Sequence, residues 1–298
     1  MKPNFFIVGA PKAGTTALSE YLRQHPEVFI SKPKEPHHFA DDLPRMKSVG
    51  SLEQYLQLFE SAHPSQTGVG EASVWYLFSK RALSNIMRFN PDAKLVIMLR
   101  NPVDLAYSLH AQMLMSTDED IPDFAEAWRL QETRAEGRRI PRNCREPSLL
   151  QYRFTCELGK QVERAFAIFP RRQIYVCCFE DFISDTARIY DEVCRFLGVT
   201  PRPPPEFKVV NPNTYYRSRR LAEAMERPSG FFSRKILGFK ASHLRKLLRA
   251  INTRTEPRQP MSARLREELA SHFRNDIRLL GKLINRDLAS WVEVQGRR

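Results

Sequence analysis

The sequence contains no long hydrophobic run. Its 298 residues are 42% hydrophobic and 27% charged, as in ordinary globular proteins, and no stretch reaches the ~18 consecutive apolar residues that a membrane span needs. The first strand-like segment starts at residue 5, which leaves no room for a signal peptide. Internal repeats and low-complexity segments are also absent. We therefore expect a cytoplasmic protein that forms one domain over 1–298, with a core over 1–200 and an extension over 201–298.

Cysteine is scarce, and its spacing argues against two kinds of site. The five cysteines are an odd number and lack the paired short spacings of a disulfide framework or a zinc site. Cys177 and Cys178 end an apolar run, so they are most simply small core residues. We expect reduced thiols, and no convincing cluster of metal ligands suggests a bound metal.

Acidic residues are too few to balance the basic ones. There are 34 Asp and Glu against 47 Lys and Arg, which gives a net charge of +13. This excess indicates an anionic ligand or surface, or else only a basic, solubilising exterior. Residues 227–254 carry eight Lys or Arg and no Asp or Glu, interleaved with apolar residues. This segment is either an amphipathic contact for an anionic acceptor or membrane, or a solvated flap that packs on the domain.

Short apolar strands alternate with longer helical patterns along the chain. The expected strands cover 5–9, 27–31, 68–71, 94–99 and 173–179, and the expected helices cover 15–25, 51–62, 79–89, 102–116, 122–137, 148–169, 186–197 and 262–285. This order predicts an α/β, P-loop-like three-layer fold: a central parallel sheet flanked by helices, with a mostly helical, basic C-terminal extension. Ligands of such sheets bind beyond the carboxyl ends of the strands, so we expect the chemistry just after residues 9, 31, 71 and 99.

The most informative segment is 5–18, which reads FFIVGAPKAGTTAL. Its apolar start predicts a buried strand, a Pro/Gly loop then carries Lys12, and Thr15 and Thr16 open a helix. Backbone N–H groups, the helix dipole and the lysine charge converge there, as phosphate binding requires. The lysine precedes the second glycine, whereas the Walker pattern has Gly-Lys-[Ser/Thr]. The loop therefore predicts a phosphate-bearing donor, held differently than in an ordinary ATPase or GTPase.

A second strand-to-helix segment, LRNPVDLAYSLH, covers 99–110. Arg100 leaves the strand at its carboxyl end, Pro102 lies near the first helical position, and Ser108 falls two turns into the helix. A guanidinium fork and a hydroxyl group suit a second phosphate group. Considered alone, such an arginine is more often a surface ion pair, but together with the first loop it indicates a ligand with two phosphate groups.

Together the two segments resemble the phosphosulfate-binding motifs of sulfotransferases that use 3′-phosphoadenylyl sulfate (PAPS). They are closer to the heparan-sulfate-type branch and its bacterial relatives than to the steroid and phenol branch. Further segments match in place: KEPHHF at 34–39, GEASVWY at 70–76, YVCCFEDF at 175–182 and FLGV at 196–199. The resemblance covers roughly 5–200 and, more loosely, the last helix. It implies PAPS as donor, 3′-phosphoadenosine 5′-phosphate (PAP) as product, no metal, and sulfuryl transfer by in-line displacement.

The resemblance also implies roles for residues that would contact the donor. The 5′-phosphosulfate would be held by Lys12, Ala13, Gly14, Thr15, Thr16 and Ala17. Lys12 would contact the oxygen that bridges sulfur and phosphorus, while Arg100 and Ser108 would bind the 3′-phosphate. Arg217 or Arg219 could close on the 3′-phosphate side, or could simply begin a solvated helix.

On the acceptor side, Glu35 aligns with the glutamate that acts as base in the heparan-sulfate-type enzymes. A glutamate at such a loop position, considered alone, is more often simply solvated. The resemblance implies that His37 and His38 shape the pocket, although His38 could instead pack in the core, and that His110 contacts the acceptor. Between the glutamate and serine of the third-strand segment those enzymes carry a lysine, where this chain has Ala72. The resemblance thus predicts transfer to a hydroxyl or amine of a carbohydrate or small metabolite, with no nucleic-acid partner.

Two other classes of function remain open. An ATP-dependent P-loop kinase would need Gly-Lys-[Ser/Thr] and an acidic Mg²⁺ ligand at a strand end, but Arg100 follows the strand that ends at residue 99. A non-catalytic protein could bind the nucleotide or a polyanion through 227–254. In that protein Glu35 would be dispensable, and polyanion binding would be sensitive to salt and would survive the loss of Lys12. The sequence carries no signal for the oligomeric state.

Overall fold

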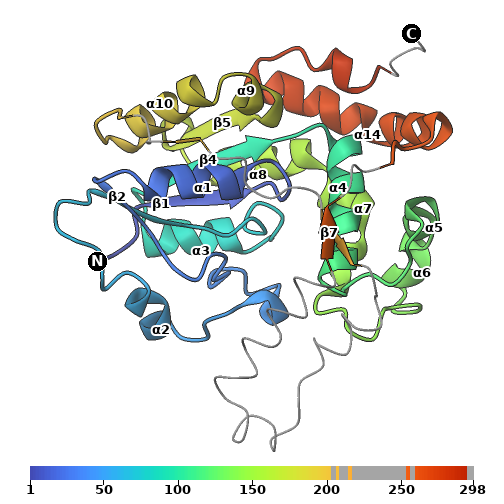
Figure 1. Cartoon of the computed structure of the whole chain (residues 1–298), viewed down its shortest axis with the longest axis horizontal. Coiled ribbons are helices and arrows are strands. Elements are labelled where there is room, and N and C mark those ends of the chain that lie inside the picture. Colours follow the sequence, from blue (N-terminus) through green and yellow to red (C-terminus); the bar gives the residue numbers. More distant parts are fainter. Residues whose placement is uncertain (203–205, 208–213, 217–252, 256–258, 294–298) are drawn as a thin grey trace, which may run out of the picture.

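A computed structural model describes residues 1–202, 206–207, 214–216, 253–255 and 259–293 (Figure 1). Arg217, Arg219 and most of the basic segment 227–254 lie outside these described residues. Within the described part, no helix is long and apolar enough to cross a membrane. All five cysteines are buried and unpaired, as the sequence predicted.

The five predicted strands form one parallel sheet. They are β1 (Phe5–Gly9), β2 (Val28–Ile30), β3 (Gly68–Ala72), β4 (Lys94–Leu99) and β5 (Ile174–Cys178), in the order β2-β3-β1-β4-β5. β1 lies at the centre and pairs with β3 and β4. Its residues are all buried, which explains the unbroken apolar run at the start of the chain. Since the strands are parallel, all their carboxyl ends meet at one edge of the sheet.

Helices cover both faces of this sheet, which confirms the three-layer α/β prediction. The α-helices are α1 (Thr15–Arg23), α2 (Leu52–Gln57), α3 (Ala82–Phe89), α4 (Pro102–Met115), α5 (Phe124–Arg129), α6 (Gln131–Ala135), α7 (Tyr152–Thr155), α8 (Leu158–Ile168), α9 (Phe179–Ser184), α10 (Thr186–Leu197) and α14 (Ala263–Ile284). Right-handed connections that run to opposite sides of β1 place α1 and α3 on opposite faces. α10 packs with α1, α8 packs with α3, and α14 packs on α8 and α4 (Figure 1).

The remaining elements are short. Among the described residues, the 3₁₀ turns are η1 (Pro44–Met46), η2 (Pro147–Leu150), η3 (Arg171–Gln173) and η4 (Ala289–Trp291), and β6 (Thr214–Tyr216) pairs antiparallel with β7 (Thr253–Thr255). The single helix predicted over 148–169 is wrong, because that stretch is divided into η2, α7 and α8. The Asp276 carboxylate of α14 accepts hydrogen bonds from the backbone N–H groups of Gly159 and Lys160, at 2.8 and 3.0 Å. This distant cap starts α8 anew, and nothing in the local pattern reveals it.

A buried ion pair stabilises the segment between α4 and α7. The side chains of Glu119 and Arg134 have no exposed surface, and two guanidinium nitrogens of Arg134 each donate to a carboxylate oxygen of Glu119 at 2.6 Å. Tyr152 donates to the same carboxylate at 2.8 Å. The pair thus ties α6 and α7 to the turn that follows α4.

Arg134→Met is expected to lower the free energy of unfolding by about 3–5 kcal/mol, because it leaves the Glu119 charge buried without its partner. Urea denaturation measures this loss. The double variant Glu119→Gln/Arg134→Met should recover part of it, since no buried charge is then left uncompensated. The control is Arg188→Met, which breaks the exposed ion pair with Glu192. It should leave the free energy of unfolding nearly unchanged. Equal losses in Arg134→Met and the control would refute the assigned role of the buried pair.

Candidate functional site

The residues predicted to carry the chemistry lie at the carboxyl edge of the sheet. Lys12 follows β1, Arg100 follows β4, and Glu35 follows β2. Arg100 donates from Nη1 to the Lys12 carbonyl oxygen at 2.9 Å, which ties the two phosphate motifs together. The Glu35 backbone N–H donates to the Ala72 carbonyl at the end of β3, at 3.1 Å. The fold thus aligns four neighbouring strand ends, as the sequence predicted.

The loop after β1 forms a cradle of backbone groups. Lys12 and Gly14 have φ angles of 59° and 88°, in the left-handed region, so the chain turns sharply before α1. A Cβ atom at Gly14 would lie 3.1 Å from the Phe182 ring, so a larger residue would crowd that ring. No side chain caps α1 and its first turn has no acidic residue. The first N–H groups of a helix have no intrahelical partner, so this end suits an anion.

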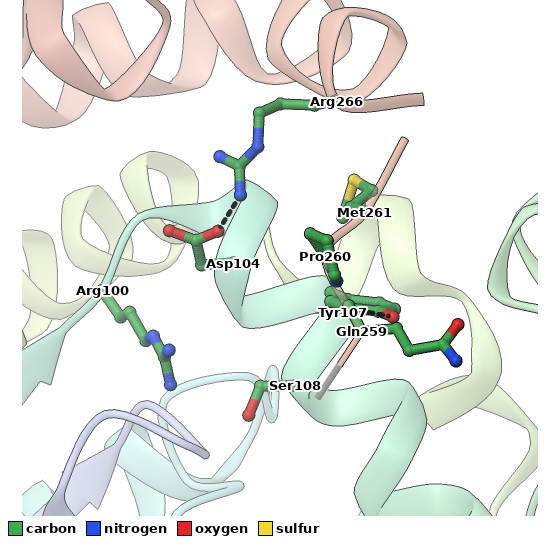
Figure 2. A pocket seen from close by; sticks show the side chains of 8 residues that line it. All are labelled: Arg100, Asp104, Tyr107, Ser108, Gln259, Pro260, Met261 and Arg266. Carbon is green, nitrogen blue, oxygen red and sulfur yellow. Dashed lines mark hydrogen bonds and ion pairs between the residues drawn. The ribbon is translucent and has the colours of Figure 1, made fainter. Parts of the chain in front are cut away.

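Arg100 and Ser108 line a cavity of about 330 Å³ beside this loop (Figure 2). The Arg100 guanidinium lies 4.7 Å from the centre of the Phe179 ring, which holds the side chain in place beside its bond to the Lys12 carbonyl. Ser108 lies on α4 and is almost fully buried. The rest of the lining is Asp104, Tyr107, Gln259, Pro260, Met261 and Arg266. The structure therefore brings Arg100 and Ser108 to one cavity, together with residues of α14 and of the segment before it.

Glu35 lies in a backbone turn next to the end of β3. Its φ angle is 63°, and its carboxylate accepts a hydrogen bond from Lys34 Nζ at 2.8 Å. The side chain is 33% exposed, so the carboxylate is accessible from the solvent side of the sheet edge. The carboxylate is therefore accessible to a ligand at the sheet edge, which is one requirement for a general base.

His37 follows Glu35 by two residues and is buried. Its backbone N–H donates to Ser73 Oγ at 3.0 Å, while its Nε2 atom is buried without a hydrogen-bond partner among the described residues. Burial lowers the pKa of His37 to about 4, so the imidazole is neutral near pH 7. A neutral ring with an unpaired nitrogen can accept or donate one hydrogen bond to a ligand at this position.

The depressed pKa of His37 predicts a pH-dependent stability. The unfolded state binds the proton near pH 6.5 and the folded state only near pH 4, so this contribution is complete above pH 6.5 and is lost as the pH falls. We expect a loss of about 2 kcal/mol between pH 7 and pH 5. His37→Asn should remove this loss, since asparagine does not titrate and tolerates the left-handed backbone. Urea denaturation at both pH values tests it, and equal losses in the two proteins would contradict it.

Glu71 is a site feature that the sequence analysis did not assign. This glutamate of β3 has no exposed surface, and its carboxylate accepts hydrogen bonds from Tyr55 (2.9 Å), Tyr76 (2.8 Å) and Ser73 (2.5 Å). Burial raises the pKa of Glu71 to about 7. Through Ser73 the group fixes the backbone of His37. An acidic residue inside an apolar strand was the signal for it in the sequence.

The remaining predicted acceptor-side residues are packed against the protein interior. His38 stacks on the Tyr55 ring with 4.7 Å between ring centres, and Ala72 is buried at the end of β3. The ring of His110 is buried, with Nε2 2.9 Å from the Ile121 carbonyl oxygen, and it packs on Phe124. This environment is that of a core side chain, and it gives no support to an acceptor contact by His110.

The parallel sheet, the loop at the end of β1 and the arginine at the end of β4 define the class: an α/β protein whose candidate site at the carboxyl edge of the sheet suits an anion. A family model described as the sulfotransferase domain matches residues 2–219, and the chain belongs to this family. The family assignment and the fold predicted from the resemblance are therefore confirmed.

Individual relatives agree with this assignment. The bifunctional heparan sulfate N-deacetylase/N-sulfotransferase 4 of Mus musculus is 26% identical and is matched over 97% of this chain and 31% of its own length. Carbohydrate sulfotransferase 15 of Mus musculus is 25% identical, over 79% of this chain and 50% of its own length. The chain thus spans 31% to 50% of the length of these relatives. The crystal structure of a sulfotransferase from Alicyclobacillus acidocaldarius superimposes with a TM-score of 0.74 and 29% identity, covering 98% of this chain and 100% of that chain.

Proposed function

We propose that this protein transfers the sulfuryl group of PAPS to a hydroxyl or amine of a carbohydrate or small metabolite. The observation that carries the proposal is a hydrogen bond that joins the two proposed anion-binding motifs. The loop around Lys12 and the Arg100–Ser108 pair are joined by the Arg100–Lys12 hydrogen bond of 2.9 Å. A nucleotide with phosphate groups at both its 5′ and 3′ positions matches two adjacent anion sites of this kind.

In this proposal the donor's 5′-phosphosulfate lies against the loop and the N-terminus of α1. The backbone N–H groups of residues 13–17 and the helix dipole stabilise its negative charge. Lys12 adds a full positive charge close to the oxygen that leaves the sulfur. Arg100 and Ser108 hold the 3′-phosphate, for which the planar guanidinium fork is well suited. Arg217 and Arg219 remain proposed donor contacts that lie outside the described residues.

The transfer step requires one proton to leave the acceptor. Glu35 takes the proton from the hydroxyl or amine as the new bond to sulfur forms, and the bond from sulfur to the bridging oxygen breaks. The electron pair of that bond remains on the phosphate oxygen of PAP, where Lys12 stabilises it. By analogy with loose phosphoryl transfer, positioning and electrostatic stabilisation supply most of the rate enhancement.

The relatives and the site support the proposed acceptor class. Two relatives are named as heparan sulfate and carbohydrate sulfotransferases, which supports a carbohydrate or similar polyol. Ala72 leaves the acceptor side without the lysine that the resemblance implies there, so the acceptor need not carry the charge of heparan sulfate. The partly exposed carboxylate of Glu35 can accept a hydrogen bond from a hydroxyl or amino group.

A transfer assay tests the proposal. The protein is incubated with PAPS and a panel of oligosaccharides with free hydroxyl and amino groups, and PAP release and acceptor mass are followed together. We expect PAP to form in step with an acceptor that gains one sulfuryl group. If ATP and Mg²⁺ phosphorylate the same panel and PAPS gives no sulfuryl transfer, the proposal is overturned in favour of a kinase.

A further inference from the structure

The cavity beside Ser108 contains an ion pair that the predicted donor contacts do not use. Arg266, in the first turns of α14, donates to the Asp104 carboxylate of α4 at 2.5 Å (Figure 2). Both side chains line the same cavity as Arg100 and Ser108. The two side chains are 35% and 38% exposed, so neither is locked inside the protein. A charged pair that borders an anion site can exchange partners when the anion arrives.

The charges in this cavity do not match those of a 3′-phosphate when the pair is closed. Of the described residues that line the cavity, Arg100 and Arg266 carry positive charge, and Asp104 neutralises Arg266 while the pair is closed, whereas a phosphate monoester carries nearly two negative charges near neutral pH. The Asp104 carboxylate would also repel the phosphate at this short range. The affinity of this cavity for a phosphate group would therefore increase if Arg266 turned from the Asp104 carboxylate to the phosphate.

The position of Arg266 makes such a turn feasible. It projects from the N-terminal part of α14, whose dipole already favours an anion, and the preceding residues Pro260 and Met261 line the same cavity. The segment before α14 is itself held on α4, because Tyr107 donates to the Gln259 carbonyl oxygen at 2.9 Å. Arg266 thus faces the cavity with a partly exposed side chain, so a rotation of that side chain would change its partner.

We propose that Arg266 is a third ligand of the donor's 3′-phosphate, and that Asp104 holds it in the empty site and sets the selectivity for 3′-phosphorylated nucleotides. This inference rests on the proposed function. A nucleotide with a free 3′-hydroxyl has no phosphate group for Arg266 to bind, so Arg266 does not raise its affinity and stays paired with Asp104. The ratio of the affinities for PAP and 5′-AMP, which differ only in the 3′-phosphate, is therefore the quantity that Arg266 and Asp104 control.

Calorimetric titration of the full chain with PAP and with 5′-AMP tests this assignment. Arg266→Gln is expected to weaken PAP binding about tenfold, the value of a charge-assisted hydrogen bond, while 5′-AMP binding changes less than about twofold. Arg266→Lys should recover part of the PAP affinity. Asp104→Asn should tighten PAP binding about threefold, because it frees Arg266 and removes the repulsion. Thermal unfolding of each variant reports whether the fold is kept.

The opposite signs separate this role from a structural one. An ion pair that only fastens α14 to α4 would be broken by either substitution, so both variants would bind PAP equally or more weakly. That result, or an unchanged ratio of PAP to 5′-AMP affinity in both variants, would overturn the assignment while the proposed function stands. If the unaltered protein does not bind PAP, the proposed function and this inference both fail.

Discussion

Lys12→Met is expected to reduce kcat/KM for sulfuryl transfer about 10²–10³-fold, the loss usually seen when one preorganised charge-stabilising group is removed. Methionine retains much of the length and apolar surface of lysine but not its charge. The backbone cradle of residues 13–17 remains, so PAP binding should weaken far less than turnover falls. Steady-state kinetics with PAPS and calorimetry with PAP measure the two effects separately.

The matched control for this substitution is Lys12→Arg, which keeps a positive charge on the same left-handed backbone position. It should retain more activity than Lys12→Met. If Lys12→Met binds PAP as the parent does and turns over within about threefold of it, Lys12 stabilises no charge in the transition state and its role is misassigned.

Glu35→Gln is expected to lower kcat about 10²–10⁴-fold, the range that general base catalysis contributes. The amide is isosteric with the carboxylate but cannot take a proton, and the turn held by the Ala72 carbonyl stays in place. The donor loop is untouched, so the affinity for PAP should stay within about twofold of the parent. Single-turnover kinetics at saturating PAPS measure the transfer step separately from donor binding.

A suitable control is Glu60→Gln, which changes an exposed glutamate away from the sheet edge and should leave kcat unaltered. If Glu35→Gln keeps its catalytic rate within about threefold of the parent, another group removes the proton. The neutral His37 below the turn would then be the first alternative to examine, through His37→Asn.

The features that the sequence predicted well are those fixed by neighbouring residues. The apolar run before Gly9 predicted a buried strand and the loop with Lys12 and Gly14 predicted a turn into a helix, and both predictions rest on neighbouring residues alone. Arg100 was predictable for the same reason, since it follows an apolar strand directly. Parallel strands then force their carboxyl ends to one edge, which brought these residues together without any knowledge of the packing.

The features that the sequence did not reveal depend on contacts between distant segments. The cap that Asp276 gives to α8 links residues 117 positions apart, and the Arg266–Asp104 pair links residues 162 apart. Glu71 belongs to the matching segment at 70–76, but the three hydroxyl groups that donate to its carboxylate come from two separate segments. His110 looked accessible beside Ser108, yet the helix turns its ring toward Phe124 in the core. Spacing along the chain cannot determine such contacts.

The most direct test of the central claim, that this site holds a nucleotide phosphorylated at both its 5′ and 3′ positions, is calorimetric titration with PAP against ATP and Mg²⁺. The account predicts that PAP binds clearly more tightly than ATP and Mg²⁺, and that Lys12→Met and Arg100→Ala each weaken PAP binding. Preference for ATP and Mg²⁺, or PAP binding that neither substitution changes, would contradict it.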